Sequence, residues 1–141
     1  MLFLPESKLK TYFAYLGTAG AICALAYPIF DPYPFLHVTI LSYVIGYFAL
    51  LIKSLIYLYG SKEKQDLPVT EVVKISLLMN LFIAMVNAPL NANYGFLKEP
   101  PLLSSANPLV NLLVVTLVVL LLVMMVQTIF SRQAGRFMVR V

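Results

Sequence analysis

Long apolar stretches separated by short polar, proline-containing segments form the main pattern of this chain. The stretches lie near residues 11–30, 36–59, 70–92 and 108–130. A helix needs about 20 residues to cross the hydrocarbon core of a bilayer, and each stretch reaches that length. The pattern therefore predicts an all-α, polytopic membrane protein with four transmembrane helices in a single domain, residues 1–141.

The first stretch shares one feature with a signal peptide, because Lys8 and Lys10 precede its apolar run. However, no clear small-x-small cleavage site precedes the second stretch. The segment from Tyr27-Pro28 to Pro34 is typical of a tight turn between two helices. We therefore expect the first helix to be retained.

Composition indicates that the bilayer is the solvent. Apolar residues make up 61% of the chain and charged residues 11%, whereas a soluble domain has roughly 45–50% and about 25%. One cysteine, one histidine and six scattered carboxylates predict no disulfide, no metal site and no cofactor. The basic residues lie at helix ends, so nucleic acid is not an expected partner. We expect a multi-pass protein of the cell membrane.

The distribution of basic residues predicts the orientation of the helices. Cytoplasmic segments of membrane proteins are enriched in lysine and arginine. One side of the predicted bundle has Lys98 alone, and the other has seven basic residues: Lys8, Lys10, Lys62, Lys64, Arg132, Arg136 and Arg140. Both termini are therefore predicted to be cytoplasmic. The three arginines recur every four residues, which favours contact between one helix face and anionic lipid.

Asparagines mark the outer end of the third stretch. Asn80, Asn87 and Asn91 share one helical stripe, and Asn93 and Tyr94 follow it. The stripe has two interpretations, interhelical hydrogen bonding or the lining of a polar cavity. Pro89 removes a helix hydrogen bond, so we expect the last turn to be kinked or unwound. The helix is thus predicted to break at its outer end.

Small residues indicate which helix faces pack closely. They allow the backbones of two membrane helices to approach each other. Lys53 continues the stripe of the second helix, and it either snorkels to the interface or meets a buried functional partner. The small residues are Gly17, Gly20, Ala21 and Ala24 in the first stretch and Ser42, Gly46 and Ala49 in the second.

Lone reactive side chains give a weak signal for catalysis. Cys23 is either a small apolar filler or a nucleophile, and no base is adjacent to it in sequence. His37 is either a capping residue or a base, and Asp31 in the same outer segment is a potential partner for it. Together with Lys53, Tyr94 and the four asparagines, His37 and Asp31 form the candidate polar pocket.

Several of these residues together resemble the YwaF-type family of integral membrane proteins. The resemblance covers roughly residues 12–130 and runs from Tyr12 and Gly20 through Pro28 and His37 to Asn87. Its most specific element is Asn93-Tyr-Gly-Phe-Leu97, followed by Pro100.

The resemblance implies that the chain corresponds to the central and C-terminal part of such a protein. A eukaryotic branch of the family includes a transmembrane acyltransferase acting on phospholipids. Members carry a Leu-Pro-Leu-(His/Glu)-Leu-Cys segment in earlier helices, and Cys23 lies in a different helix. They also have a histidine midway along the helix equivalent to 36–59, where Tyr47 stands here.

Three functions follow as hypotheses. The first is a small non-catalytic membrane subunit that packs against a larger partner complex of integral membrane subunits. The second is a lipid-directed, acyltransferase-like enzyme with an outward-facing headgroup pocket. The third is an accessory protein for transport or immunity that binds a lipid or small molecule. We rank them in this order, because the cysteine-bearing segment of the family has no counterpart here.

Overall fold

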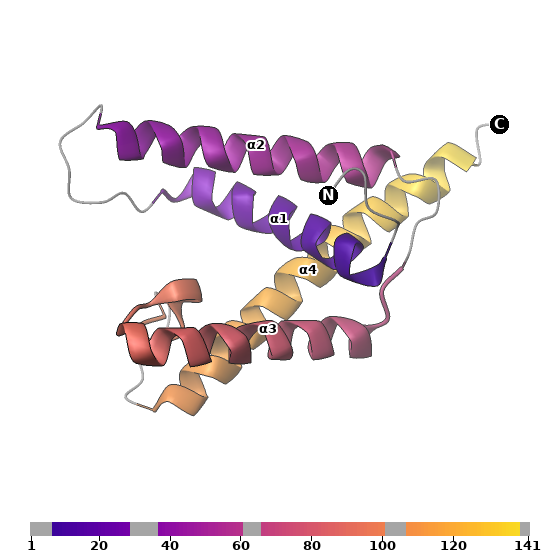
Figure 1. Cartoon of the computed structure of the whole chain (residues 1–141). Helices are drawn as coiled ribbons and strands as arrows, with labels where there is room; N and C mark the ends of the chain where they lie inside the picture. Colours follow the sequence, from indigo (N-terminus) through magenta and orange to yellow (C-terminus); the bar gives the residue numbers. More distant parts are fainter. Residues whose placement is uncertain (1–6, 29–36, 61–65, 101–106, 139–141) are drawn as a thin grey trace. The chain divides into compact units, whose positions relative to one another are not determined.

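The computed structural model describes residues 7–28, 37–60, 66–100 and 107–138, with side chains as far as Ser131. Within these ranges the chain forms four α-helices and one short 3-10 helix (Figure 1). All-helical structure is thereby confirmed. The elements are α1 (Lys8–Ala26), α2 (Val38–Gly60), α3 (Val69–Leu90), η1 (Tyr94–Phe96) and α4 (Pro108–Met138).

The helix bounds differ from the predicted ones for local reasons. α1 begins earlier than expected because Ser7 caps it, with the Lys10 N–H donating to Ser7 Oγ at 3.3 Å. It also ends earlier, at Ala26, because Pro28 disfavours helical backbone at the residue before it. α4 continues beyond the expected residue 130 to Met138.

Three of the described helices are long and apolar enough to cross a membrane: α2, α3 and residues Pro108–Ser131 of α4. α1 is not among them, since its 19 residues include Lys8, Lys10 and the hydroxyl groups of Thr11 and Thr18. The expected fourth span therefore stays a prediction, as does the orientation of the termini.

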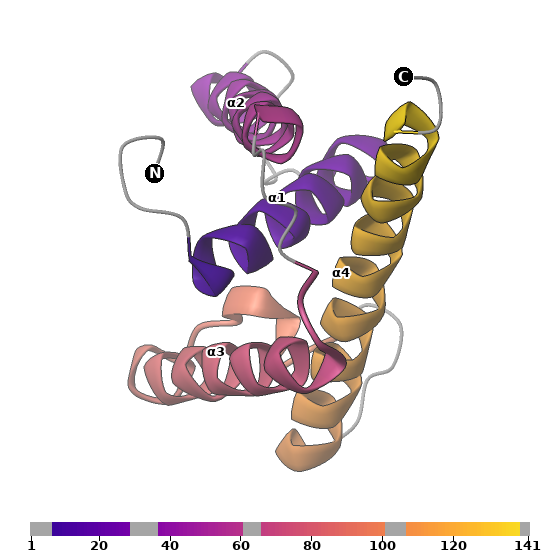
Figure 2. The same ribbon diagram turned by 90° about the vertical axis from the view of Figure 1, so that its right-hand side faces the viewer.

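The described residues fall into two compact units. The first comprises described parts of residues 1–66 and 126–141, and the second comprises those of 67–125. In the first unit α1 and α2 run side by side in opposite directions (Figures 1 and 2). The Tyr43 hydroxyl donates to the Ala24 carbonyl at 3.0 Å near one end, and the Thr11 and Tyr57 hydroxyls lie 3.1 Å apart near the other.

Burial within the first unit is uneven. α1 buries a continuous face that includes Tyr12, Tyr15, Gly17 and Ala21. In α2 the buried residues are Ser54 and Leu58. The last part of α4 also belongs to this unit, where the rings of Phe130 and Tyr59 meet edge to face at 5.3 Å.

The second unit contains α3, η1 and the first part of α4. Val72, Ser76, Asn80 and Asn87 form the buried stripe of α3. Asn80 Nδ2 donates to Thr116 Oγ1 of α4 at 3.0 Å, and η1 lies against α3 (Figure 2). Asn111 of α4 donates to the Lys98 carbonyl at 3.0 Å, which ties the segment after η1 to that helix.

Candidate functional site

A cavity of about 360 Å³ lies between α1 and α2, within the first unit. Its α1 wall consists of Lys10, Phe13, Ala14, Leu16, Gly17 and Gly20. Its α2 wall consists of Tyr47, Leu50, Lys53, Ser54 and Tyr57. The volume is within the range of roughly 300–1,000 Å³ that is usual for small-molecule sites.

The polar groups of the cavity concentrate at one end. Lys10 Nζ lies 4.8 Å from the centre of the Tyr57 ring, a cation–π contact. The same Tyr57 accepts or donates the hydrogen bond with Thr11. Lys53 precedes Tyr57 by one helical turn, and Ser54 follows Lys53 directly. Towards the other end the walls are formed mainly by apolar groups and glycine, together with Tyr47.

Gly17 sets the spacing of the two helices at the cavity. A Cβ atom at Gly17 would lie 2.6 Å from Ser54 Oγ and 3.3 Å from Leu50 Cδ1. Both distances are closer than ordinary contact, so a side chain at position 17 would require Ser54 and Leu50 to shift, and glycine lets the backbone of α1 approach α2 without that change. Gly20, one turn later, has no atom within 4 Å of its ideal Cβ position and borders open space.

The other predicted packing residues are differently placed. Ala21 is buried and Ala24 is half-buried. Ser42, Gly46 and Ala49 of α2 are exposed, and no described atom lies within 4 Å of the ideal Cβ position of Gly46. The small-residue face of α2 is thus uncovered among the described residues.

The C-terminal end of α3 is closed by its own side chains. Asn87 makes two hydrogen bonds to the backbone of Tyr94: its Nδ2 donates to the carbonyl at 2.9 Å, and its Oδ1 accepts from the N–H at 3.0 Å. Asn93 Oδ1 accepts from the N–H groups of Lys98 and Glu99. These asparagines therefore hold the segment after the helix.

α3 remains helical past Pro89 as far as Leu90, which differs from the expected unwinding of its last turn. The break follows at Asn91, which adopts a left-handed conformation with φ 47°. The N–H groups of Asn91 and Ala92 both donate to the Asn87 carbonyl. A left-handed cap of this kind ends the helix cleanly, so the proline is accommodated at the end of an otherwise regular helix.

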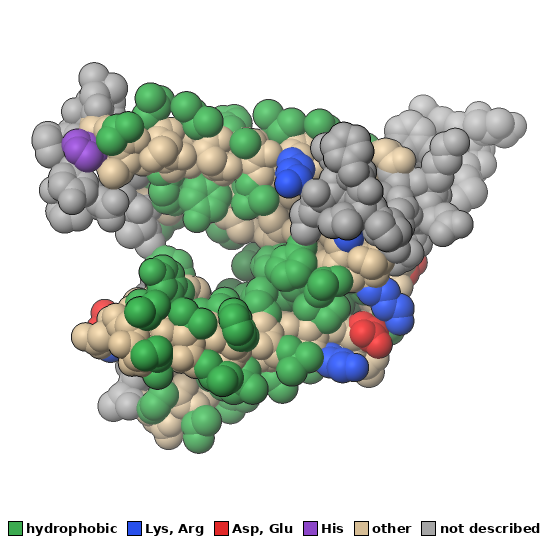
Figure 3. Space-filling view, in the orientation of Figure 1, with side chains coloured by type: hydrophobic (Ala, Val, Ile, Leu, Met, Phe, Trp, Pro, Cys, Tyr) green, Lys and Arg blue, Asp and Glu red, His purple; other side chains and the backbone are tan. Residues whose placement is uncertain are grey.

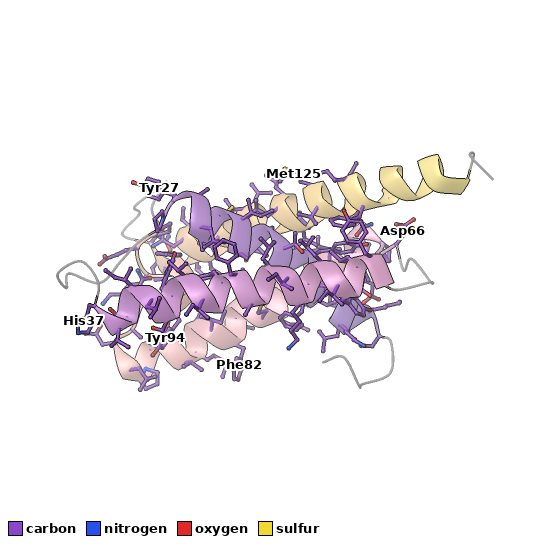
Figure 4. The ribbon with its side chains drawn as sticks, turned by 90° about the horizontal axis from the view of Figure 1, so that it is seen from above. Tyr27, His37, Asp66, Phe82, Tyr94 and Met125 are labelled. Atoms are coloured by element: carbon purple, nitrogen blue, oxygen red, sulfur yellow. The ribbon has the colours of Figure 1, made fainter. Side chains whose placement is uncertain are left out.

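His37 caps the N-terminus of α2 (Figure 4). Its Nδ1 accepts a hydrogen bond from the Thr39 N–H at 3.4 Å and lies 3.0 Å from Thr39 Oγ1. Figure 4 shows His37 at the start of α2 and Asp66 at the opposite end of that helix. Asp31, its expected partner, lies outside the described residues.

The candidate polar pocket is divided between the two units. His37 and Lys53 belong to the first unit, whereas Asn80, Asn87, Asn91, Asn93 and Tyr94 belong to the second. The first unit brings Lys53 together with Lys10, Ser54 and Tyr57. The side chains of Arg132, Arg136 and Arg140 lie outside the described part of the structure.

Sequence reasoning missed most of the residues that line the cavity. Tyr47, Leu50, Ser54 and Tyr57 recur at intervals of three or four, so they share one face of α2. That spacing was available in the sequence. The opposing wall of α1 was found only in part, through Gly17 and Gly20.

Many large apolar side chains are exposed in the described part of the chain, and they cover much of the face seen in Figure 3. Phe82, for example, projects away from α3 and is 67% exposed (Figure 4). Such a surface is unfavourable in water, and three helices suit a bilayer span. The protein is therefore an integral membrane protein of helical type.

The chain belongs to the TMEM164 family, whose family model matches residues 1–129. The searches of curated proteins and of solved structures found no match. Family membership agrees with the membrane class that the helices define. The YwaF-type naming, and the correspondence to only the central and C-terminal part of a relative, stay predictions.

Proposed function

We propose that this protein is a non-catalytic membrane subunit that packs its helices against a larger membrane partner. The observation that supports the proposal is the uncovered face of α2. Only 6% of the most apolar window of this helix is buried. Ser42, Gly46 and Ala49 stand on its exposed side.

Small residues on a membrane helix bring little benefit against lipid. Their advantage is that another helix backbone can approach closely and gain van der Waals contact. Ser42, Gly46 and Ala49 are spaced by four and three residues, so they form one continuous groove along α2. A helix from a partner subunit is the occupant that this groove suits.

The predicted orientation is part of this proposal. With both termini cytoplasmic and the protein in the cell membrane, the His37 end of α2 faces outward. The acyltransferase-like alternative depends on the resemblance and assigns His37 to chemistry. The cap that His37 forms at α2 gives a structural role for the same side chain.

The test is the mass of the native assembly after gentle solubilisation, with partners identified by mass spectrometry. We expect a species larger than the 15.8 kDa chain. Gly46→Leu should remove the partner, because a large side chain fills the groove. Ile45→Leu is the matched control, since Ile45 is exposed on the neighbouring face and the change conserves volume. A strictly monomeric wild type, or a Gly46→Leu protein that keeps its partner, would overturn the proposal.

A further inference from the structure

The cavity between α1 and α2 extends along the two helices, so its two ends can be described separately. Lys10 lies in the first turn of α1, and Tyr57 lies one turn before the end of α2. This end of the cavity is therefore level with helix termini. Gly20 lies ten residues further along α1 than Lys10, which is about 15 Å at the α-helical rise of about 1.5 Å per residue.

The polarity of the cavity changes along this direction. Lys10, Lys53 and Tyr57 lie towards the terminal end, and Ser54 lies level with Gly17. Further in, the walls include Leu16, Leu50 and Tyr47. A bilayer changes in the same way from its interface to its centre. The polarity of the cavity thus changes along its length as the polarity of one lipid leaflet does. Its polar end lies where α2 approaches the interface.

The described side chains that line the cavity carry charge of one sign. Lys10 and Lys53 line the cavity, and the lining residues within the described part of the chain include no carboxylate. Lys53 has no hydrogen bond or ion pair with any part of the chain that the structure describes. An ammonium group within a membrane span is costly unless it reaches the interface or finds an anion. The hydroxyls of Ser54 and Tyr57 add hydrogen-bonding capacity beside the two cations.

We propose that this cavity binds one anionic phospholipid. The phosphate lies between Lys10 and Lys53 at the polar end, and one acyl chain follows the apolar walls towards Gly20. A zwitterionic headgroup suits the site less well, because it brings its own cation to the two lysines. A soluble anion leaves the apolar part unfilled. The lipid site uses the side of α2 that faces α1, whereas Ser42, Gly46 and Ala49 are exposed; Lys53 continues their stripe and also lines the cavity.

The experiment is native mass spectrometry of the full chain purified in detergent and mixed with defined lipids. Phosphatidylglycerol and phosphatidylcholine with identical acyl chains are compared at equal concentration. We expect phosphatidylglycerol to be retained more strongly.

Lys53→Gln should weaken that retention about fivefold, as a basic residue near an anionic headgroup typically contributes. Lys53→Arg should restore it. Lys74→Gln, an exposed lysine of α3, is the matched control and should have no effect.

A second variant tests the acyl-chain part independently of charge. Gly20→Leu fills open space in the cavity without touching either lysine, so it should reduce phosphatidylglycerol binding while thermal unfolding shows an intact fold. Glycerol phosphate, which has the anion without the chain, should not compete. Equal retention of both lipids, unchanged binding by Lys53→Gln or by Gly20→Leu, or competition by glycerol phosphate would overturn the proposal. None of these outcomes bears on the native assembly mass, so the two proposals fail separately.

Discussion

At the scale of single residues, the structure distinguishes glycines that look alike in the sequence. Gly17 and Gly20 share the small-residue face of the first helix. Gly17 meets Ser54 and Leu50 across a tight helix contact, whereas Gly20 faces the cavity. The first is required by close approach, and the second leaves room for a ligand.

A methyl group at these two positions should therefore have opposite effects. We expect Gly17→Ala to lower the free energy of unfolding by about 1–3 kcal/mol through overpacking. Gly20→Ala should be neutral or stabilising by about 0.5–1 kcal/mol, because alanine favours a helix over glycine. Thermal unfolding in detergent measures both. Adding Ser54→Ala to Gly17→Ala should recover part of the loss, and equal effects of the two glycine variants would contradict this account.

Asn87 and Asn93 are a second pair of like residues with different roles, because their side chains bond to different backbone groups. Asn87 protects the Tyr94 N–H, and Asn93 protects those of Lys98 and Glu99. In hydrogen exchange, Asn87→Ala should speed exchange at Tyr94. Asn93→Ala should speed exchange at Lys98 and Glu99 instead. Each variant is the control for the other, and the same exchange pattern in both would show that the segment opens as one piece.

At the scale of elements, one polar pair joins α3 to α4. Asn80 is 1% exposed, and its amide donates to Thr116 Oγ1. The Thr116 hydroxyl itself donates to the Leu112 carbonyl at 2.7 Å. The Thr116 hydroxyl thus accepts one hydrogen bond and donates another, and the Asn80 amide joins two apolar helices. This is the interhelical role that asparagine often has in membrane helices.

A double-mutant cycle measures the coupling energy between Asn80 and Thr116. With Asn80→Leu and Thr116→Val, we expect a coupling energy of about 0.6 kcal/mol, and at most about 1.7 kcal/mol, as for other polar pairs in membranes. Unfolding in mixed micelles gives the four free energies. The cycle removes the packing change of each single variant. A coupling energy of zero would mean that the hydrogen bond adds nothing to the contact.

At the scale of the whole molecule, both proposals depend on how α2 lies in the bilayer. Its 23 residues are long enough to span the membrane, and its two ends carry different chemistry. His37 caps one end, and the lysine-lined part of the cavity lies near the other. The proposed lipid site thus requires that the two ends of α2 face opposite sides.

Cysteine labelling tests this arrangement in intact cells. Cys23→Ala removes the single native cysteine. In that background, Val38→Cys should react with a membrane-impermeant maleimide from outside. Gly60→Cys should react only after the cells are permeabilised. The reverse pattern would invert the predicted orientation, and labelling of both positions from outside would show that α2 does not span.

The sequence by itself determined the class of protein and the four α-helices of the described residues, because apolar length is a local property that needs no partner. It also located the small residues and the asparagines. It misplaced the ends of α1 and the effect of Pro89, since caps such as Ser7 and Asn91 act through backbone geometry that hydropathy does not record.

Tertiary structure alone decided which of these residues meet. Periodicity places Ser54 and Tyr57 on one face of α2, but only the antiparallel register of α1 brings Lys10 over Tyr57 and Gly17 against Ser54. It also assigns Lys53 to a cavity and leaves Gly46 uncovered. The physical reason is that a contact between helices depends on the register and rotation of both, and neither helix encodes these on its own.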